Sequence, residues 1–137
     1  MTMTTEIGGR DAALAALHGY LVEHDASYLA EDATFSDVTS GMQWTGREAI
    51  GAMLQWMYRG VFEARAEDLR LIVDADGTAA AAELTFVGRH IGEFAGVPGT
   101  GRDVRVPMVV IYELAGGQIT GARVHFSVAS FLAQVST

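Results

Sequence analysis

The chain has 137 residues, half of them hydrophobic, and a formal net charge of -8 at pH 7. This length suits one domain with a single core, and the acidic excess argues against nucleic acid or an anionic membrane surface as partner. The sequence has no cysteine and no lysine, which excludes disulfides, thiolate nucleophiles and lysine Schiff bases. Chemistry therefore has to come from Asp, Glu, His, Tyr, Ser or Thr side chains.

The opening stretch MTMTTEIGG has neither a basic start nor a long apolar run, so we expect neither a signal peptide nor a membrane anchor. We interpret residues 1–9 as a flexible tail and residues 10–137 as a single domain. No apolar run approaches the ~20 residues that cross a bilayer. The expectation is a cytoplasmic protein without a membrane partner.

The first half of the domain predicts two helices with a strand between them. Over residues 10–24, apolar side chains recur at the spacing of an amphipathic helix: Ala13, Leu14, Leu17, Tyr20 and Leu21. A short helical turn and a strand over residues 33–38 follow, in which Phe35 and Asp37 project to the same side. A second helix is expected over residues 45–62.

Local signals predict how several of these elements begin and end. Thr45 and Glu48 have the spacing of a capping box at the start of the second helix. The sequence DADG at 74–77 predicts a hairpin turn, because Asp and Gly tolerate positive φ angles. Ser127 is placed to cap a terminal helix.

The second half predicts four consecutive antiparallel strands, with a glycine-rich loop over residues 91–103. Helices early and strands late indicate an α+β fold. The strand VPMVVIYEL is apolar on both faces, so both faces need cover. We expect helices on one face and a second copy of the chain, in a homodimer, on the other.

Several stretches, in this order, carry a resemblance to a known family: AEDATFSDV, GREAI, GEFAGVPGTGRDVRV, GGQITGARVHF and SFLAQV. Over residues 11–135 the chain resembles a SnoaL-like protein of the nuclear-transport-factor-2-like superfamily. The resemblance implies a cone in which a curved antiparallel sheet wraps around the N-terminal helices. It also implies an apolar pocket, a dimer, and activity without metal or organic cofactor.

The resemblance implies catalytic positions as well, and the chain departs from them. Polyketide cyclases of this type use an aspartate on the last strand, which falls at Val124. The similar limonene epoxide hydrolases use an Asp-Arg-Asp set, whose other members fall at Glu83 and Thr85. Asp37 occupies a position that in relatives is often Asn or Asp and faces the pocket, so a carboxylate is expected there.

Three residues are the candidate catalytic groups. Asp37 and Glu83 are expected to face the cone, where two carboxylates in an apolar cavity would form an acid and base pair. The alternative is that Glu83 pairs with Arg105 or Arg123, or lies at a solvated rim. Tyr112 is expected to face the cone and to donate its hydroxyl to a carbonyl oxygen, with ordinary core packing as the alternative.

The remaining candidates line the expected pocket or its surroundings. Predicted substrate-binding residues are Phe35, Trp44, Met53, Trp56, Thr85, Met108, Val110, Val124 and Phe126. His125 should face away from the cone, and His90 should stand at the pocket mouth. His90 and Glu93 lack a third ligand, so no metal site is predicted.

The leading hypothesis is a cofactor-independent cyclase or isomerase that acts on a hydrophobic, polyketide-like small molecule by substrate positioning and general acid–base catalysis. The first alternative is an epoxide hydrolase or epoxide-opening cyclase. The second is a non-catalytic small-molecule binding protein, favoured by Val124 and its apolar neighbours. A third is a protein–protein module that uses the open sheet face.

Overall fold

The structure, a computed structural model, describes residues 9–23 and 25–136. The predicted tail lies outside these residues except for Gly9, with which the first helix begins. His24 also lies outside them.

Helical elements occupy both ends of the chain and its middle. They are α1 (Gly9–Leu21), the 3-10 turn η1 (Ala26–Tyr28), α2 (Arg47–Gln55), the π-helix η2 (Trp56–Val61) and α3 (Val128–Val135). The strands are β1 (Leu29–Asp37), β2 (Gln43–Thr45), β3 (Phe62–Val73), β4 (Ala79–His90), β5 (Asp103–Ala115) and β6 (Gln118–Phe126). In the described part of the chain, no helix is long and apolar enough to cross a bilayer.

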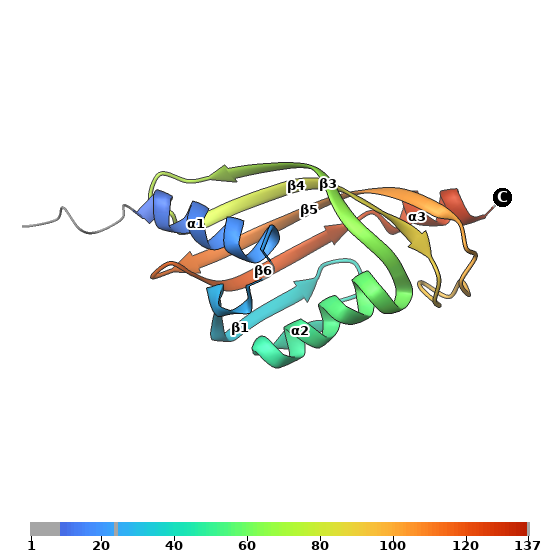
Figure 1. Cartoon of the computed structure of the whole chain (residues 1–137), viewed down its shortest axis with the longest axis horizontal. Helices are drawn as coiled ribbons and strands as arrows, with labels where there is room; N and C mark the ends of the chain where they lie inside the picture. Colours follow the sequence, from blue (N-terminus) through green and yellow to red (C-terminus); the bar gives the residue numbers. More distant parts are fainter. Residues whose placement is uncertain (1–8, 24, 137) are drawn as a thin grey trace, which may run out of the picture.

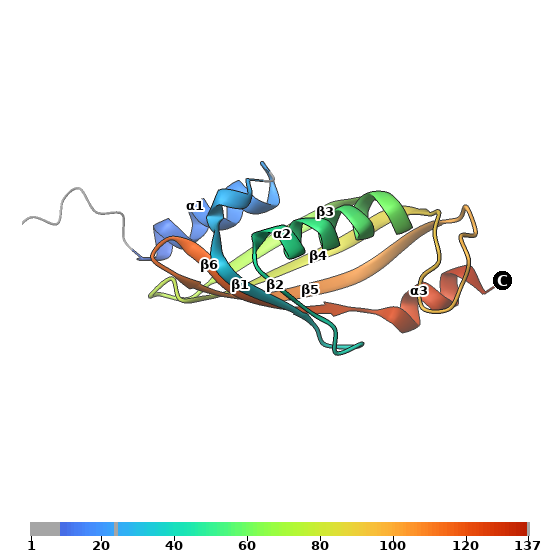
Figure 2. The ribbon, with the colours of Figure 1, turned by 90° about the horizontal axis from the view of Figure 1, so that it is seen from below.

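The strands form one curved sheet in the order β2-β1-β6-β5-β4-β3 (Figure 1). The four predicted antiparallel strands are confirmed as β3 to β6. The sheet is mixed rather than wholly antiparallel, because β1 pairs parallel to β6. Figure 2 shows α1 and α2 on the same side of this sheet, which we call the inner face. The predicted α+β cone is therefore confirmed.

Two of the three local signals are confirmed. In the β3–β4 turn, the Asp74 carboxylate accepts from the amide of Thr78 at 2.9 Å. The Ser127 hydroxyl accepts from the amide of Ser130 at 3.3 Å and caps α3.

The predicted capping box was wrong. Thr45 is the last residue of β2, and Gly46 is the N-cap of α2 without a side-chain cap. Thr45 pairs with Thr34 of β1, so strand pairing prevents it from capping the helix.

Strand register decides which side chains reach the inner face. Opposite residues of paired strands project to the same face. One row of partners runs through Leu71, Ala82, Val110, Val124 and Asp37, and the next through Val73, Ala80, Tyr112, Ala122 and Phe35. The buried members of these rows belong to the core together with Ala13, Leu17 and Tyr20 of α1. The inner face is thus an apolar surface that carries Asp37 near its β1 edge.

Candidate active site

Three tyrosines from three different elements meet above the inner face, and we call them the tyrosine cluster. Tyr20 comes from α1, Tyr58 from η2 and Tyr112 from β5. The rings of Tyr20 and Tyr112 lie 6.3 Å apart in an edge-to-face arrangement. Phe35 of β1 completes a triangle, 6.0 Å from Tyr20 and 6.4 Å from Tyr112. The amphipathic pattern of α1 turns Tyr20 toward the sheet, since it follows Ala13, Ala16 and Leu17 on the buried stripe.

Burial and mutual repulsion keep these phenols protonated. Burial raises the pKa of Tyr58 to about 12. Burial, and then the nearby Tyr58 hydroxyl, raise the pKa of Tyr20 above its ordinary value. The pKa of Tyr112 is raised well above its ordinary value, by burial first and then by Tyr20 and Tyr58. All three groups are therefore neutral hydrogen-bond donors near neutral pH.

Asp37 lies on the inner face directly beside the position where the resemblance expects the acid. It ends β1, and its register partner on β6 is Val124. Its carboxylate accepts from the Ser40 hydroxyl at 2.7 Å and from the Thr39 amide at 3.2 Å. These bonds orient the carboxylate within the turn between β1 and β2, where Asp37 is half-buried.

The predicted inward orientation of Glu83 and Thr85 was wrong. Glu83 is exposed, and its partner on β5 is Val109, on the face opposite to Val110. Leu84 and Phe86, which alternate with these two residues along β4, are buried in the core instead. A shift of one residue in the assumed alignment reverses the face of every side chain in a strand.

The epoxide-hydrolase pattern is therefore not assembled. Val124 faces inward, whereas Glu83 and Thr85 project from the outer face of the sheet. The two arginines considered as partners of Glu83 pair with other carboxylates. Arg123 contacts Glu113 at 2.6 Å, and Arg105 contacts Glu67 at 3.3 Å.

Most of the predicted substrate-binding residues lie on or above the inner face. Those buried in the core or packed against it are Phe35, Trp44, Met53, Met108, Val110, Val124 and Phe126. Trp56 is 44% exposed, although its ring lies 6.4 Å from Phe94. Thr85, also predicted to bind substrate, lies on the outer face of the sheet according to the strand register.

A second aromatic group fills the other half of the inner face, and we call it the phenylalanine cluster. It contains Phe62, Phe86, Phe94, Phe126 and Phe131, packed around His90 with ring centres 4.9–6.4 Å apart. His90 ends β4 beside the glycine-rich loop as predicted, but it is fully buried rather than at a pocket mouth. Its Nδ1 accepts from the Thr100 amide at 3.3 Å, so the ring proton is on Nε2.

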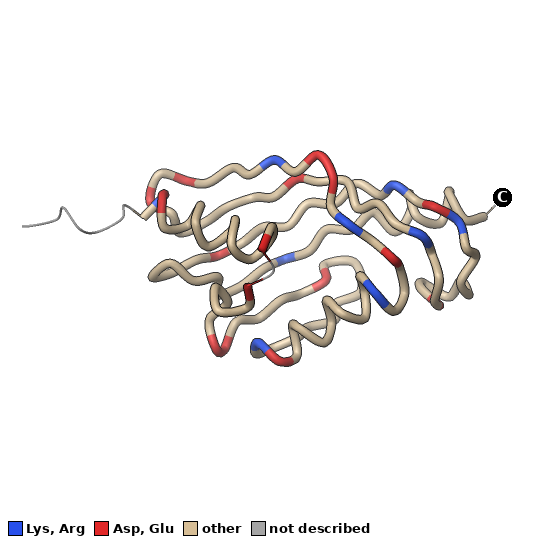
Figure 3. Tube along the Cα trace, viewed as in Figure 1, with Lys and Arg blue, Asp and Glu red and all other residues tan. Residues whose placement is uncertain are grey.

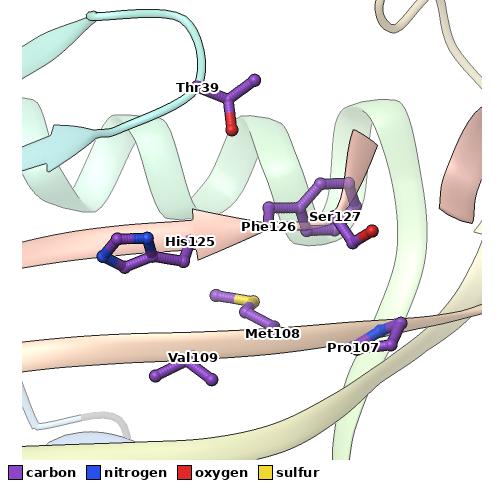
Figure 4. Close-up of a pocket in the computed structure, with 7 residues that line it drawn as sticks. All are labelled: Thr39, Pro107, Met108, Val109, His125, Phe126 and Ser127. Atoms are coloured by element: carbon purple, nitrogen blue, oxygen red, sulfur yellow. The ribbon is translucent and has the colours of Figure 1, made fainter. Parts of the chain in front are cut away.

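A shallow hollow of about 210 Å³ opens where β5 and β6 diverge (Figure 4). It is lined by Thr39, Pro107, Met108, Val109, His125, Phe126 and Ser127. The hydroxyl of Thr39 points toward the strand ends in this view. His125 is exposed and pairs with Val109, which confirms that it faces away from the cone. Among the described residues, no three His, Asp or Glu side chains gather to hold a metal ion.

Sequence reasoning missed two members of the tyrosine cluster. Tyr20 was part of a predicted apolar stripe, and Tyr58 lay in a helix expected to be mostly core. The residue type was the signal that could have identified them, because a buried tyrosine usually needs a hydrogen-bond partner for its hydroxyl.

Solved structures share this fold over nearly the whole chain. A proposed polyketide cyclase from Xanthomonas campestris pv. campestris superposes with a TM-score of 0.82 at 22% identity, covering 93% of this chain and 99% of that one. A phenazine biosynthesis-related protein from Pseudomonas aeruginosa gives 0.77 at 16% identity, covering 93% and 87%. A proposed isomerase from Bacillus subtilis gives 0.71 at 18% identity, covering 95% and 96%.

A search of curated proteins found no match. The family model for SnoaL-like polyketide cyclases, in contrast, matches residues 11–135, which is nearly the whole domain. The chain therefore belongs to the SnoaL-like polyketide cyclase family.

Proposed function

We propose that the protein is a cofactor-independent cyclase or isomerase that acts on a hydrophobic, polyketide-like small molecule. The observation that carries this proposal is the pairing of Asp37 with Val124. The chain lacks an acid where the resemblance expects one, yet a carboxylate lies on the adjacent strand and the same face. Family membership supports this class of reaction.

In the proposed step, the Asp37 carboxylate takes a proton from a carbon next to a substrate carbonyl. The electron pair moves to the carbonyl oxygen, and the neutral Tyr112 hydroxyl donates a hydrogen bond to the resulting enolate. In a cyclisation the enolate carbon attacks a second carbonyl, whose oxygen takes the proton back from Asp37; in an isomerisation Asp37 returns the proton to another carbon. Neighbouring strands lie about 4.8 Å apart, so β1 and β5 are separated by about 10 Å, which suits a flat ligand between the two groups.

The test is exchange of the α-protons of 2-tetralone for deuterium, followed by NMR in D₂O. We expect Asp37→Asn to slow the exchange about 100-fold and to leave tetralone binding nearly unchanged. Asp32→Asn is the matched control, because Asp32 is an exposed carboxylate of the same strand. Equal rates in wild type and Asp37→Asn would contradict the acid–base role.

A binding protein is the second candidate, and the apolar row of Val110 and Val124 favours it. It predicts that wild-type protein binds tetralone but does not exchange its protons faster than buffer. The same experiment therefore separates the two functions.

We also propose a homodimer through the outer face of the sheet. On this face β5 carries Val109 and Ile111, which are half-buried, and the edge strand β3 carries Ile72, which is 56% exposed. Within residues 9–23 and 25–136, no helix covers this face in Figure 2, and charges of both signs alternate along β3 in Figure 3. An apolar centre with both charge signs at its edges suits a second copy of the same surface.

Light scattering after gel filtration tests the dimer. We expect a dimer for the wild type and a monomer for Ile111→Arg, because the new charge would be buried at the contact. Val22→Arg, an exposed change in the turn after α1, is the control. A monomeric wild type would contradict the proposal.

A further inference from the structure

The hollow between β5 and β6 has no part in the proposed function. Figure 4 views it with α2 behind the strands, so it opens on the outer face, opposite to the face that carries Asp37 and Tyr112. The register of β5 with β6 ends at the pair Met108 and Phe126, and the chain then turns at Ser127 into α3. The hollow lies where this pairing stops.

The lining of the hollow combines an apolar part with a polar part. The apolar members are Pro107, Met108, Val109 and Phe126, and the polar members are Thr39, His125 and Ser127. Phe126 is buried and Met108 is half-buried, and both types of side chain make favourable contacts with an aromatic ring. The volume of about 210 Å³ is smaller than the roughly 300–1,000 Å³ of pockets for drug-sized ligands, so the hollow suits a single ring.

The three polar side chains can each donate a hydrogen bond beside this apolar surface. The Ser127 oxygen accepts from the Ser130 amide at 3.3 Å, which leaves the hydrogen of its own hydroxyl available. The Thr39 hydroxyl points toward the strand ends in Figure 4, and the His125 imidazole has at least one N–H in either charge state. None of the seven lining residues is an acid. Donors without an acid favour a carboxylate as the ligand group.

Hydrogen bonds within the turn between β1 and β2 fix the position of Thr39. The Thr39 amide donates to the Asp37 carboxylate at 3.2 Å, and the Gly41 amide donates to the Asp37 carbonyl at 2.8 Å. The Asp37 amide in turn donates to the Met42 carbonyl at 2.9 Å. Thr39 is therefore held in place before a ligand arrives, which lowers the entropy cost of binding. The same donors offset the charge of the Asp37 carboxylate.

The other charges near the hollow oppose an anion only weakly. Glu83 lies on the same row of the outer face as His125, but β5 with Val109 separates their two strands, which are about 10 Å apart. Arg70 is the register partner of Glu83 on β3 and balances its charge. The net charge of -8 acts from larger distances, and salt at physiological ionic strength screens charges beyond about 8 Å.

We propose that this hollow is a second ligand site, which binds a small aromatic carboxylate. The ring lies against Met108 and Phe126, and the carboxylate accepts hydrogen bonds from Thr39, His125 and Ser127. All seven lining residues belong to one chain, so the site needs no second copy, although the proposed dimer would enclose it further. The inference does not depend on the proposed function, because the hollow and the candidate catalytic groups lie on opposite faces of the sheet.

Fluorine NMR with 4-fluorobenzoate tests the site on the full-length wild-type protein. We expect this acid to bind about tenfold more tightly than 4-fluorobenzyl alcohol, which keeps the ring but lacks the charge. Thr39→Val and His125→Leu should each weaken binding of the acid about tenfold, because each removes a donor to a charged group. Both variants should bind the alcohol nearly as wild type does. His18→Leu is the matched control, since His18 is an exposed histidine of α1.

The site is contradicted if wild-type protein does not bind 4-fluorobenzoate, or binds the acid and the alcohol equally. It is also contradicted if either Thr39→Val or His125→Leu binds the acid as tightly as wild type. Thr39 and His125 are exposed, so both variants should keep the wild-type melting temperature. The 2-tetralone experiment fails independently: 4-fluorobenzoate binding without proton exchange contradicts the acid–base function alone, and exchange without 4-fluorobenzoate binding contradicts this inference alone.

Discussion

The tyrosine cluster and the phenylalanine cluster share one face of one sheet, but they differ in how their polar atoms are treated. The rings of Phe62 and Phe131 flank the buried His90 imidazole, Thr100 bonds its Nδ1, and its Nε2 has no partner. In the tyrosine cluster, none of the three described hydroxyls is both fully enclosed and unpaired. A protein interior normally satisfies or excludes polar groups. The enclosed polar atom without a partner among the described residues therefore belongs to the phenylalanine cluster, whereas the tyrosine cluster brings neutral hydrogen-bond donors to the inner face.

The largest expected effect comes from the phenylalanine cluster. Phe62 is fully buried and contacts five aromatic rings of the cluster, including His90. Phe62→Ala should lower the free energy of unfolding by about 4 kcal/mol, because it removes a large buried side chain and leaves a cavity. Urea denaturation measures the change. Tyr112→Phe, a change in the other cluster, should alter stability by less than about 1 kcal/mol; equal losses would remove the distinction between the two clusters.

The second effect concerns the anchor of α1, which carries Tyr20. Gly77 has φ of 74°, and a Cβ there would collide with the backbone oxygen of Gly9. Gly77→Ala should lower the free energy of unfolding by about 2 kcal/mol, because the start of α1 must move. Gly116→Ala is the control, with φ of 58° and open space around the new methyl group. If the free energy of unfolding falls by the same amount in both variants, the contact with Gly9 contributes nothing to stability.

The third prediction uses the pH dependence of stability. Burial raises the pKa of Tyr58 from 10.0 to about 12. The unfolded chain therefore loses this proton at lower pH, and stability present below pH 10 is lost as pH rises toward 12. At pH 11 the ionisation of Tyr58 should lower the free energy of unfolding by about 1.4 kcal/mol, and Tyr58→Phe should remove this decrease. Urea denaturation at pH 9 and 11 measures it, with Tyr28→Phe keeping the wild-type slope.

The smallest effect concerns the loop beside His90. The Thr100 hydroxyl lies 3.0 Å from His90 Nδ1 and accepts from the Arg102 amide at 3.3 Å. Thr100→Val keeps the shape of the side chain but removes both hydrogen bonds of its hydroxyl. It should lower the free energy of unfolding, measured by thermal unfolding, by about 1 kcal/mol. Proton exchange of 2-tetralone should not change, because Asp37 and Tyr112 lie outside the phenylalanine cluster. A larger effect on exchange than on stability would show that the two clusters are coupled.

Much of the fold could be predicted, and the errors have local causes. The alternation of β5 placed Met108, Val110 and Tyr112 on the inner face, as the structure has them. The same reasoning applied to β4 would have turned Leu84 and Phe86 inward, since they alternate with Glu83 and Thr85. The assignment of Glu83 to the cone followed the family pattern instead of this alternation. Residue chemistry was the better guide to the face of the strand.

The candidate site was predictable only in part. Asp37 and Tyr112 could be identified as polar residues on strands of known alternation. Tyr20 and Tyr58 could not be grouped with them, because the three residues are separated by more than thirty positions in the sequence. No residue pattern within α2 predicts the π-helix that follows it.

The sequence by itself determined the class of fold, the amphipathic stripe of α1, the turn at Asp74 and the inner face of β5. These features depend on interactions between residues close together in the chain, which composition and spacing record. The tertiary structure decided that β1 pairs parallel to β6, that Asp37 lies beside Val124, and that three tyrosines meet above the sheet. Such contacts join distant segments, and their register results from the packing of the whole core rather than from any one stretch of residues.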